Sequence, residues 1–312
     1  MKHLKVFIIG MALLQMGCGG SGNGKKSPTD TYSAGSIWMV ADDAYQPMVD
    51  AEIKVYEALY QGTTIHVKYE TEDSVFKDLM AYDTLRLAIA SRKLTKQEED
   101  YFHAKTYEPE EVKIATDAVA LIVNNSNPDS LFTLKMIRDI FTGKDSTWDA
   151  VNPKSKLGAI TVVFDHENSS NSRYINENIL KGQKFPSYCF AVHGNSQVID
   201  YVNKHPGAMG IIGINWVSDT YDSTVMKFLS QVHIVGLSTK DNPALEDYYQ
   251  PYQAYMKMDN YPLCRDVYII KTEPRMGLGT GFTSFVAGDK GQRIILRAGL
   301  LPATIPTRVV KF

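Results

Sequence analysis

Hydrophobic and polar residues in the first hundred positions alternate between two periods. Apolar residues at every second position, or in short continuous runs, predict three strands. Those strands are expected at 36–40, 64–69 and 85–90. Apolar residues spaced by three or four predict helices that begin at Pro47 and near 74, and Thr95 opens a capping box for a third. Strands that alternate with helices predict a parallel sheet covered by helices, which is an α/β fold.

The same alternation continues through the rest of the chain, and no internal repeat of fixed period interrupts it. Further strands are expected at 118–123, 160–164, 209–214, 232–237 and 267–271. Further helices are expected after Thr133, after the polar turn 165–173, after Ser196 and over 282–297. Five tyrosines between 248 and 261 indicate an amphipathic surface segment.

The N-terminus has the pattern of a secretory signal. Residues 1–17 combine two lysines with an apolar run of roughly nine residues, too short for a stable membrane-spanning helix. Gly17-Cys18 resembles a bacterial lipobox, which implies a lipid attached to Cys18, and 18–34 then form a Gly/Ser-rich tether. The alternative is an ordinary signal peptide with an incidental cysteine.

Composition narrows the functional classes. The chain of 312 residues is 44% hydrophobic and 22% charged, which is typical of globular proteins, and its formal net charge is −2. Loss of the two lysines in the signal would make the mature charge −4, so a nucleic-acid partner is not expected. An extracytoplasmic location permits a disulfide between Cys189 and Cys264, although two unpaired thiols are the favoured interpretation.

One polar turn carries the strongest signal for a ligand. After the strand expected at 160–164, the chain reads Asp165-His166-Glu167-Asn168-Ser169-Ser170-Asn171-Ser172-Arg173 and then enters a helix. Free N–H groups at a helix start, together with hydroxyl groups and an arginine, favour an anion. The alternative is that Ser169 or Ser170 only caps the helix.

Other chemistries lack their motifs. The histidines and three cysteines show no metal-ligand spacing, and no G-x-S-x-G elbow is present, so we expect neither a metal, a cofactor nor an enzyme. The glycine-rich stretch 277–281 lacks the spacing of a dinucleotide site and is expected to be a loop.

Several stretches, in order along the mature chain, resemble the phosphate-binding lipoproteins of ABC importers, which have the type II periplasmic-binding-protein fold. They are SRKLTKQE at 91–98, TDAVALIVN at 116–124, LKMIRDIFTG at 134–143, HPGAMG at 205–210, YPLCR at 261–265 and the closing helix with its Gly-Gln and Ala-Gly. Each stretch is weak alone, and their order makes the set specific for the fold.

The resemblance implies two α/β lobes with the ligand in a cleft between them. Lobe 1 would comprise 35–117 and 264–312, and lobe 2 would be the inserted 118–263. In that family a loop after the first strand, a loop near the Ser-Arg pair and a turn on the other lobe hold the anion. The implied ligand-binding residues are Asp42, Asp43, Ser91, Arg92, His166, Ser169, Ser170, Asn171, Ser172 and Arg173.

The candidate loops depart from the family pattern. Asp42 and Asp43 stand where the family has a Gly/Ser turn, and both glycines of the third loop are missing. One carboxylate there would accept a hydrogen bond from protonated phosphate and reject sulfate, which has no proton at neutral pH. The alternatives are that Asp42 or Asp43 caps the helix that begins at Pro47, and that Arg92 pairs with Glu98 or Asp117.

The resemblance implies a monomeric, periplasmic lipoprotein that captures phosphate or a related oxyanion and delivers it to an ABC permease. Closure of the lobes about the crossings at 115–118 and 259–265 would bury the ligand. One alternative is a binding or sensory module of the same fold with a changed ligand. A more remote one is a phosphatase-type enzyme.

Overall fold

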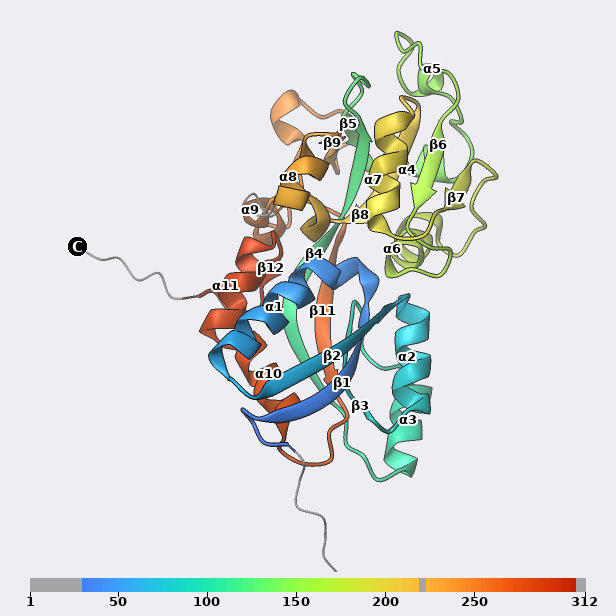
Figure 1. Ribbon diagram of the computed structural model, residues 1–312. Coiled ribbons are helices and arrows are strands. Elements are labelled where there is room, and N and C mark those ends of the chain that lie inside the picture. The colour runs from blue at the N-terminus through green and yellow to red at the C-terminus, as the bar shows by residue number, and fades with distance from the viewer. Residues whose placement is uncertain (1–29, 219–222, 307–312) are drawn as a thin grey trace, which may run out of the picture.

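The computed structural model describes residues 30–218 and 223–306. The expected signal, Cys18 and most of the tether lie outside the described residues. The fold has two groups of strands that share one long strand, β4 (Glu110–Asn124), with helices on both sides of each group (Figure 1). This arrangement confirms the α/β class expected from the alternation of periods.

The first group has five strands in the order β2-β1-β3-β11-β4, and the short strand β12 (Leu301–Pro302) also pairs with β4. Strands β1 to β3 are parallel, and β11 is antiparallel to both of its neighbours. Helices α2 and α3 cover one face, and α1, α10 and α11 cover the other (Figure 1). The bounds are β1 Gly35–Asp42, β2 Thr63–Glu70, β3 Leu85–Ala90, β11 Cys264–Lys271, α1 Gln46–Leu59, α2 Glu72–Ala81, α3 Lys96–Ala104, α10 Leu278–Ala287 and α11 Asp289–Arg297.

The second group continues from the C-terminal half of β4 through β8 and β6 to β7. Strand β9 also pairs with β4, while β10 and β5 form a separate parallel pair. Its strands are β5 Leu131–Thr133, β6 Thr161–Phe164, β7 Cys189–Ala191, β8 Ala208–Gly213, β9 Val232–Ile234 and β10 Gly236–Ser238. Its helices are α4 Leu134–Phe141, α5 Trp148–Val151, α6 Ser170–Ile175 with a π-helical continuation Asn176–Leu180, α7 Asn195–Lys204, α8 Ser223–Leu229 and α9 Gln253–Lys257.

The long strand β4 changes partner part of the way along. Residues up to Ala118 pair with β11, and Val119–Val123 pair with β8. The last turn before β11 also bonds here, since the N–H of Val119 donates to the carbonyl of Leu263 at 2.9 Å. The change of partner supports lobe boundaries at 117/118 and 263/264, which we keep as a proposal.

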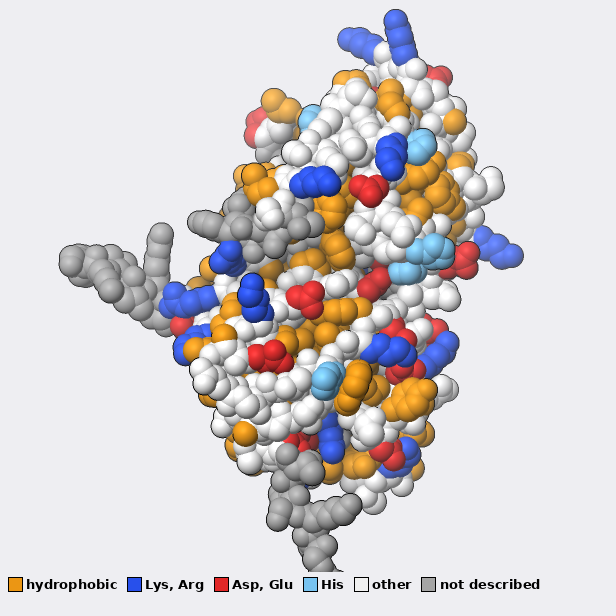
Figure 2. Space-filling model, in the orientation of Figure 1, with side chains coloured by type: hydrophobic (Ala, Val, Ile, Leu, Met, Phe, Trp, Pro, Cys, Tyr) orange, Lys and Arg blue, Asp and Glu red, His pale blue; other side chains and the backbone are white. Residues whose placement is uncertain are grey.

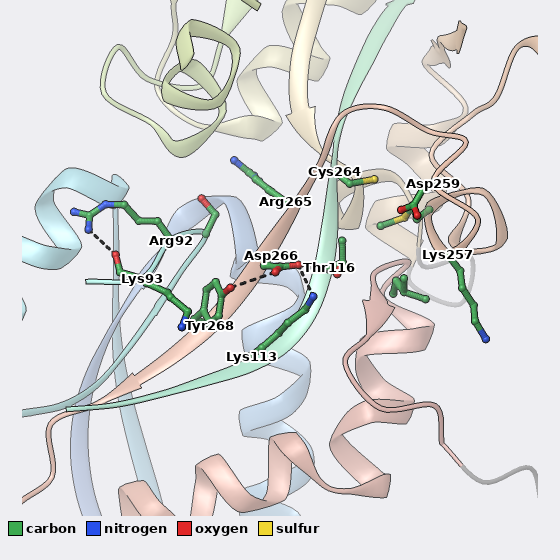
Figure 3. A pocket seen from close by; sticks show the side chains of 13 residues that line it. Arg92, Lys93, Lys113, Thr116, Lys257, Asp259, Cys264, Arg265, Asp266 and Tyr268 are labelled. Carbon is green, nitrogen blue, oxygen red and sulfur yellow. Dashed lines mark hydrogen bonds and ion pairs between the residues drawn. The ribbon is translucent and has the colours of Figure 1, made fainter. Parts of the chain in front are cut away.

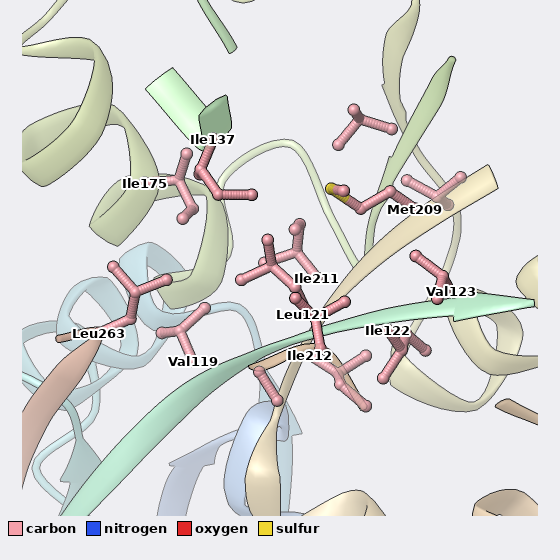
Figure 4. Close-up of a cluster of buried hydrophobic side chains, with 14 of the residues drawn as sticks. Val119, Leu121, Ile122, Val123, Ile137, Ile175, Met209, Ile211, Ile212 and Leu263 are labelled. Atoms are coloured by element: carbon pink, nitrogen blue, oxygen red, sulfur yellow. The ribbon is translucent and has the colours of Figure 1, made fainter. Parts of the chain in front are cut away.

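Each group of strands has its own apolar core. Figure 4 shows the core of the second group, where Val119, Leu121, Ile211 and Met209 pack together between the helices. The first sheet has separate clusters on its two faces. Burial of each aliphatic side chain stabilises the fold by roughly 1.5–3 kcal/mol, so each part has apolar contacts of its own that hold its shape.

Most of the predicted helices and strands are confirmed. Two differ, because each is divided where the sequence predicts one continuous element. The strand expected at 232–237 is divided into β9 and β10, which belong to different sheets. The helix expected over 282–297 starts earlier, at Leu278, and is divided at Gly288 into α10 and α11.

The glycine-rich stretch was predicted as a loop and is instead the start of α10. The carboxylate of Glu273 accepts hydrogen bonds from the N–H groups of Gly277, Gly279 and Thr280 at 2.8–3.2 Å. A carboxylate seated on the first N–H groups of a helix offsets the low helix propensity of glycine. Glu273 lies four positions before Gly277, outside the short pattern from which a helix start is predicted.

Buried Glu52 generates a prediction about pH. This α1 side chain is 1% exposed, neither carboxylate oxygen has a hydrogen-bond partner among the described residues, and burial raises its pKa from 4.5 to about 9. The folded state therefore binds more protons than the unfolded state, so stability falls as the pH rises between these values. We expect Glu52→Gln to raise the free energy of unfolding by about 1–3 kcal/mol at pH 8, with little change at pH 4.

Urea unfolding of both proteins across this pH range measures the effect. The matched control is Glu246→Gln, which removes an exposed carboxylate. An equal pH dependence in the wild type and Glu52→Gln would contradict the account.

Candidate functional site

Charged and polar side chains from both parts of the fold meet where three strands end. Asp42 is the last residue of β1, Ser91 directly follows β3, and Asp165 directly follows β6. In α/β folds, ligands bind outside the carboxyl ends of such strands. Arg265 of β11 reaches the same place from the crossing strands.

The turn Ser169–Arg173 begins α6, as expected, and Ser169 caps it. Ser169 accepts from the N–H of Ser172 at 3.1 Å and donates its hydroxyl to Asp165 at 2.5 Å. The capping role left open from the sequence is therefore the one observed for Ser169. Ser172 donates to backbone carbonyls, whereas the hydroxyl of Ser170 is buried without a partner among the described residues.

Arg173 joins the two parts of the fold. Its Nε lies 2.6 Å from Oε2 of Glu72, and its Nη2 donates to the hydroxyl of Ser91 at 2.9 Å. Its Nη1 lies 2.8 Å from the exposed Glu177. Burial alone would raise the pKa of Glu72, but Arg173 and the bond from Ser91 outweigh burial and hold this pKa below its ordinary value. Glu72 is therefore ionised at neutral pH.

A second arginine, Arg265, is buried beside the group formed by Arg173, Glu72 and Ser91. Its Nε and Nη2 lie 3.0 and 2.9 Å from Oδ2 of Asp117, and Nη2 donates to Oδ1 of Asn171 at 2.9 Å. Its Nη1 has no partner among the described residues. Asn171 also donates to Asp165, whose pKa is raised to about 6 by burial and by nearby Asp43.

Asp42 is buried with one oxygen unused. Its Oδ1 accepts from the N–H of Ala44 at 3.1 Å and caps the short helix Asp43–Tyr45. Its Oδ2 makes no well-formed hydrogen bond in the described part of the chain, although the hydroxyl of Ser170 lies near enough to Asp42 to offset part of the rise in its pKa. Burial, and then the charges of Glu72 and Asp43, raise the pKa of Asp42 well above its ordinary value, so the protonated form is favoured.

Asp43 does not cap α1, because Tyr45 holds that position. Its Oδ2 instead lies 2.9 Å from Nε2 of His166, which comes from the turn after β6. The bond to Asp43 raises the pKa of His166 in spite of partial burial. This pair is a second ionic contact between the two parts of the fold.

Arg92 is the candidate that the structure does not bring to this group. It forms a bidentate pair with Glu98, with distances of 2.8 and 2.9 Å, and lies 3.5 Å over the ring of Phe76. This is the pairing that the sequence analysis left open as an alternative. The backbone and hydroxyl of neighbouring Ser91, not the side chain of Arg92, face Arg173 and Glu72.

A cavity of about 690 Å³ opens at the crossing strands (Figure 3). Thr116 and Asp266 line it from β4 and β11, while Lys113 pairs with Asp266 at 2.5 Å. Arg265 also lines it and so lies between the cavity and the buried group. Sequence reasoning did not anticipate this cavity.

Four charged residues of the buried group were missed as site residues: Glu72, Asp117, Asp165 and Arg265. Asp117, Asp165 and Arg265 stand in stretches named above, and Glu72 follows the strand expected at 64–69. The signal that could have identified them is an ionisable residue next to a predicted strand end. Their pairing could not be predicted, because the partners lie up to 148 positions apart in the sequence.

Other expectations concern absences. Within residues 30–218 and 223–306, no cluster of three or more His, Cys, Asp or Glu side chains could hold a metal ion. No helix in these ranges is long and apolar enough to span a bilayer. Cys189 and Cys264 are both free thiols, which agrees with the unpaired interpretation. Acidic and basic side chains are interspersed on the face shown in Figure 2, so any ion site depends on local groups.

The fold and this buried group define a class of binding proteins. Residues 26–290 match the family model described as a PBP superfamily domain, and the chain belongs to that superfamily. Solved structures of the type II periplasmic-binding-protein fold match it. A substrate-binding protein from Clostridium perfringens, solved with bound phosphate, has a TM-score of 0.70 at 20% identity over 86% of this chain and 100% of its own.

Other relatives carry similar names. The "Phosphate-binding protein PstS" of Staphylococcus saprophyticus is 23% identical over 300 residues, which cover 94% of this chain and 88% of that protein. The PstS of Pseudomonas aeruginosa PAO1 is 22% identical and covers 89% and 85%. An ABC-type phosphate transport receptor from Vibrio cholerae has a TM-score of 0.61 at 18% identity, over 86% of this chain and 99% of its own.

The pair formed by His166 and Asp43 predicts how stability depends on pH. A histidine whose pKa is raised on folding contributes stability below its unfolded pKa, near 6.5, and loses it as the pH rises through its folded value. We expect His166→Asn to lower the melting temperature at pH 6 and to have less effect at pH 9, because the wild type has then lost the pair. Calorimetry at the two pH values measures this difference.

The control is His233→Asn in β9, which removes an exposed histidine. If His166→Asn lowered the melting temperature equally at both pH values, the ionic contact would not be its cause.

Proposed function

We propose that this protein captures phosphate or a related oxyanion between two lobes and delivers it to an ABC permease. The observation that carries the proposal is that the partly exposed Arg173, the buried Arg265 and several hydroxyl groups, contributed by both lobes, converge at the ends of β1, β3 and β6. The names of the relatives, together with the shared fold, support phosphate as the ligand.

The proposed ligand contacts come from both lobes. Arg173 supplies a guanidinium fork, Ser91 supplies an N–H group and a hydroxyl, and Ser170 supplies a buried hydroxyl that has no other partner among the described residues. Asn171 would hold Arg265 in place. When phosphate binds, Asp42 would ionise and accept the proton of the ligand through Oδ2, which favours phosphate over sulfate, since sulfate brings no proton.

The same proposal covers location and partners. Residues 1–17 would direct export, and lipid on Cys18 with the tether 18–34 would anchor a monomer at the periplasmic face of a bacterial membrane. The relatives are binding proteins, and we propose no enzymatic activity for this chain. Closure about β4 and β11 would present the loaded form to the permease.

A second candidate is a binding or sensory module of the same fold with another ligand. The observation that favours it is the charge of the buried group. Five carboxyl groups lie near two arginines and one histidine there, and each carboxyl group that is ionised repels a doubly charged anion. The carboxyl groups are those of Asp42, Asp43, Glu72, Asp117 and Asp165.

Ligand-dependent melting separates the two candidates. We expect phosphate to stabilise the purified protein by about 2.7 kcal/mol at a hundredfold excess over Kd, or about 5–10 °C in Tm, and sulfate to stabilise it less. Asp42→Asn should reduce the preference for phosphate over sulfate, and Asp73→Asn, an exposed acid at the start of α2, should leave it unchanged.

A lack of any shift with phosphate, sulfate, tungstate or a phosphonate would contradict the proposed function. Native mass spectrometry of freshly purified protein that shows a different bound molecule would then favour the second candidate. An unchanged preference in Asp42→Asn would remove Asp42 from the selective role.

A further inference from the structure

The carboxylate of Glu72 occupies the donors that an oxyanion would use. Its Oε1 accepts from the N–H of Ser91 at 2.8 Å and from the Ser91 hydroxyl at 2.6 Å. Its Oε2 lies 2.6 Å from Nε of Arg173, which belongs to the other lobe. Two oxygens of one anion therefore bind an N–H group, a hydroxyl and a guanidinium drawn from both lobes.

The surroundings of Glu72 stabilise the ionised form of its carboxylate. The residue is 2% exposed, and Arg173 and Ser91 hold its pKa below the ordinary value although burial opposes this. A buried carboxylate costs several kcal/mol to desolvate unless charged and hydrogen-bonding partners compensate, and here three donors do so.

We propose that Glu72 is a built-in anion that holds the two lobes together in the ligand-free protein and competes with the captured anion for Ser91 and Arg173. This inference rests on the proposed function for the identity of the competing ligand. The contact itself requires no ligand, because the carboxylate comes from the chain.

Two structural features make the displacement feasible. Glu72 is the first residue of α2, directly after Thr71, so its side chain swings without breaking the helix. Arg173 keeps a second carboxylate partner, Glu177, one helical turn away and 55% exposed. Arg173 therefore keeps a weak, solvent-exposed carboxylate contact while Glu72 leaves and phosphate enters.

Competition has a calculable effect on affinity. If the state with Glu72 released is populated at about 1–10%, the apparent affinity for the ligand falls to that fraction of its intrinsic value, which is about 10- to 100-fold weaker. Glu72 would thus set the concentration at which the protein loads. It would also favour doubly charged anions, since a singly charged anion offers Arg173 no more charge than the carboxylate that it displaces.

The experiment compares Glu72→Gln with Glu177→Gln by calorimetric titration of inorganic phosphate. Both variants remove a carboxylate that pairs with Arg173, but only Glu72 also holds Ser91. We expect Glu72→Gln to bind phosphate about 10- to 100-fold more tightly than the wild type. Glu177→Gln should stay within about threefold, because exposed pairs contribute little.

A second measurement does not depend on phosphate. Small-angle X-ray scattering of the ligand-free proteins should show an increased radius of gyration for Glu72→Gln and no change for Glu177→Gln. Formate, a small carboxylate, should restore the compact form of Glu72→Ala, which also serves if Glu72→Gln does not fold without an added anion.

The outcomes separate this inference from the proposed function. If the wild type binds phosphate and Glu72→Gln binds it no more tightly, the inference is overturned while the function stands. If neither protein binds phosphate, the proposed function fails, and scattering decides the inference. Opening in Glu72→Gln with closure by formate supports a built-in anion, and an unchanged radius of gyration overturns it.

Discussion

Two arginines, the partly exposed Arg173 and the buried Arg265, join the two parts of this protein, and the arrangement where the parts meet depends on them. Arg173 extends from α6 to Glu72 and Ser91, and Arg265 extends from β11 to Asp117 and Asn171. Arg265 requires a carboxylate partner, because an unpaired buried charge costs several kcal/mol, and Arg173 is also paired with carboxylates. These carboxylates make the place where the two parts meet acidic, so the proposed ligand contacts are groups that also pair with one another.

This constraint explains how the chain belongs to the PBP superfamily and yet departs from the family's loop pattern. The crossing strands β4 and β11 and the strand ends are retained, so the fold still brings loops from both lobes together. Charged side chains replace the small residues of those loops. Function in such a fold depends on the residues of the site. In the proposed site, acidic and basic side chains pair with one another without a ligand.

The sequence predicted elements whose pattern is local and missed contacts that are not. The strand at 85–90 and the capping box at Thr95 were predicted correctly, because periodicity and caps are read from neighbouring residues. Ser169 was identified with both of its possible roles. The pairing of Arg92 with Glu98 was anticipated as an alternative, whereas Glu72 and Arg265 were overlooked. Their partners lie 101 and 148 positions away, so only the tertiary fold brings them together.

The central claim is that Glu72 and the captured anion use the same donors. A crystal structure of the protein grown with saturating phosphate tests this most directly. The account predicts phosphate within hydrogen-bond distance of Arg173 and of the Ser91 N–H group, with the carboxylate of Glu72 displaced from both. Phosphate bound elsewhere, with Glu72 still paired to Arg173 and Ser91, would contradict it.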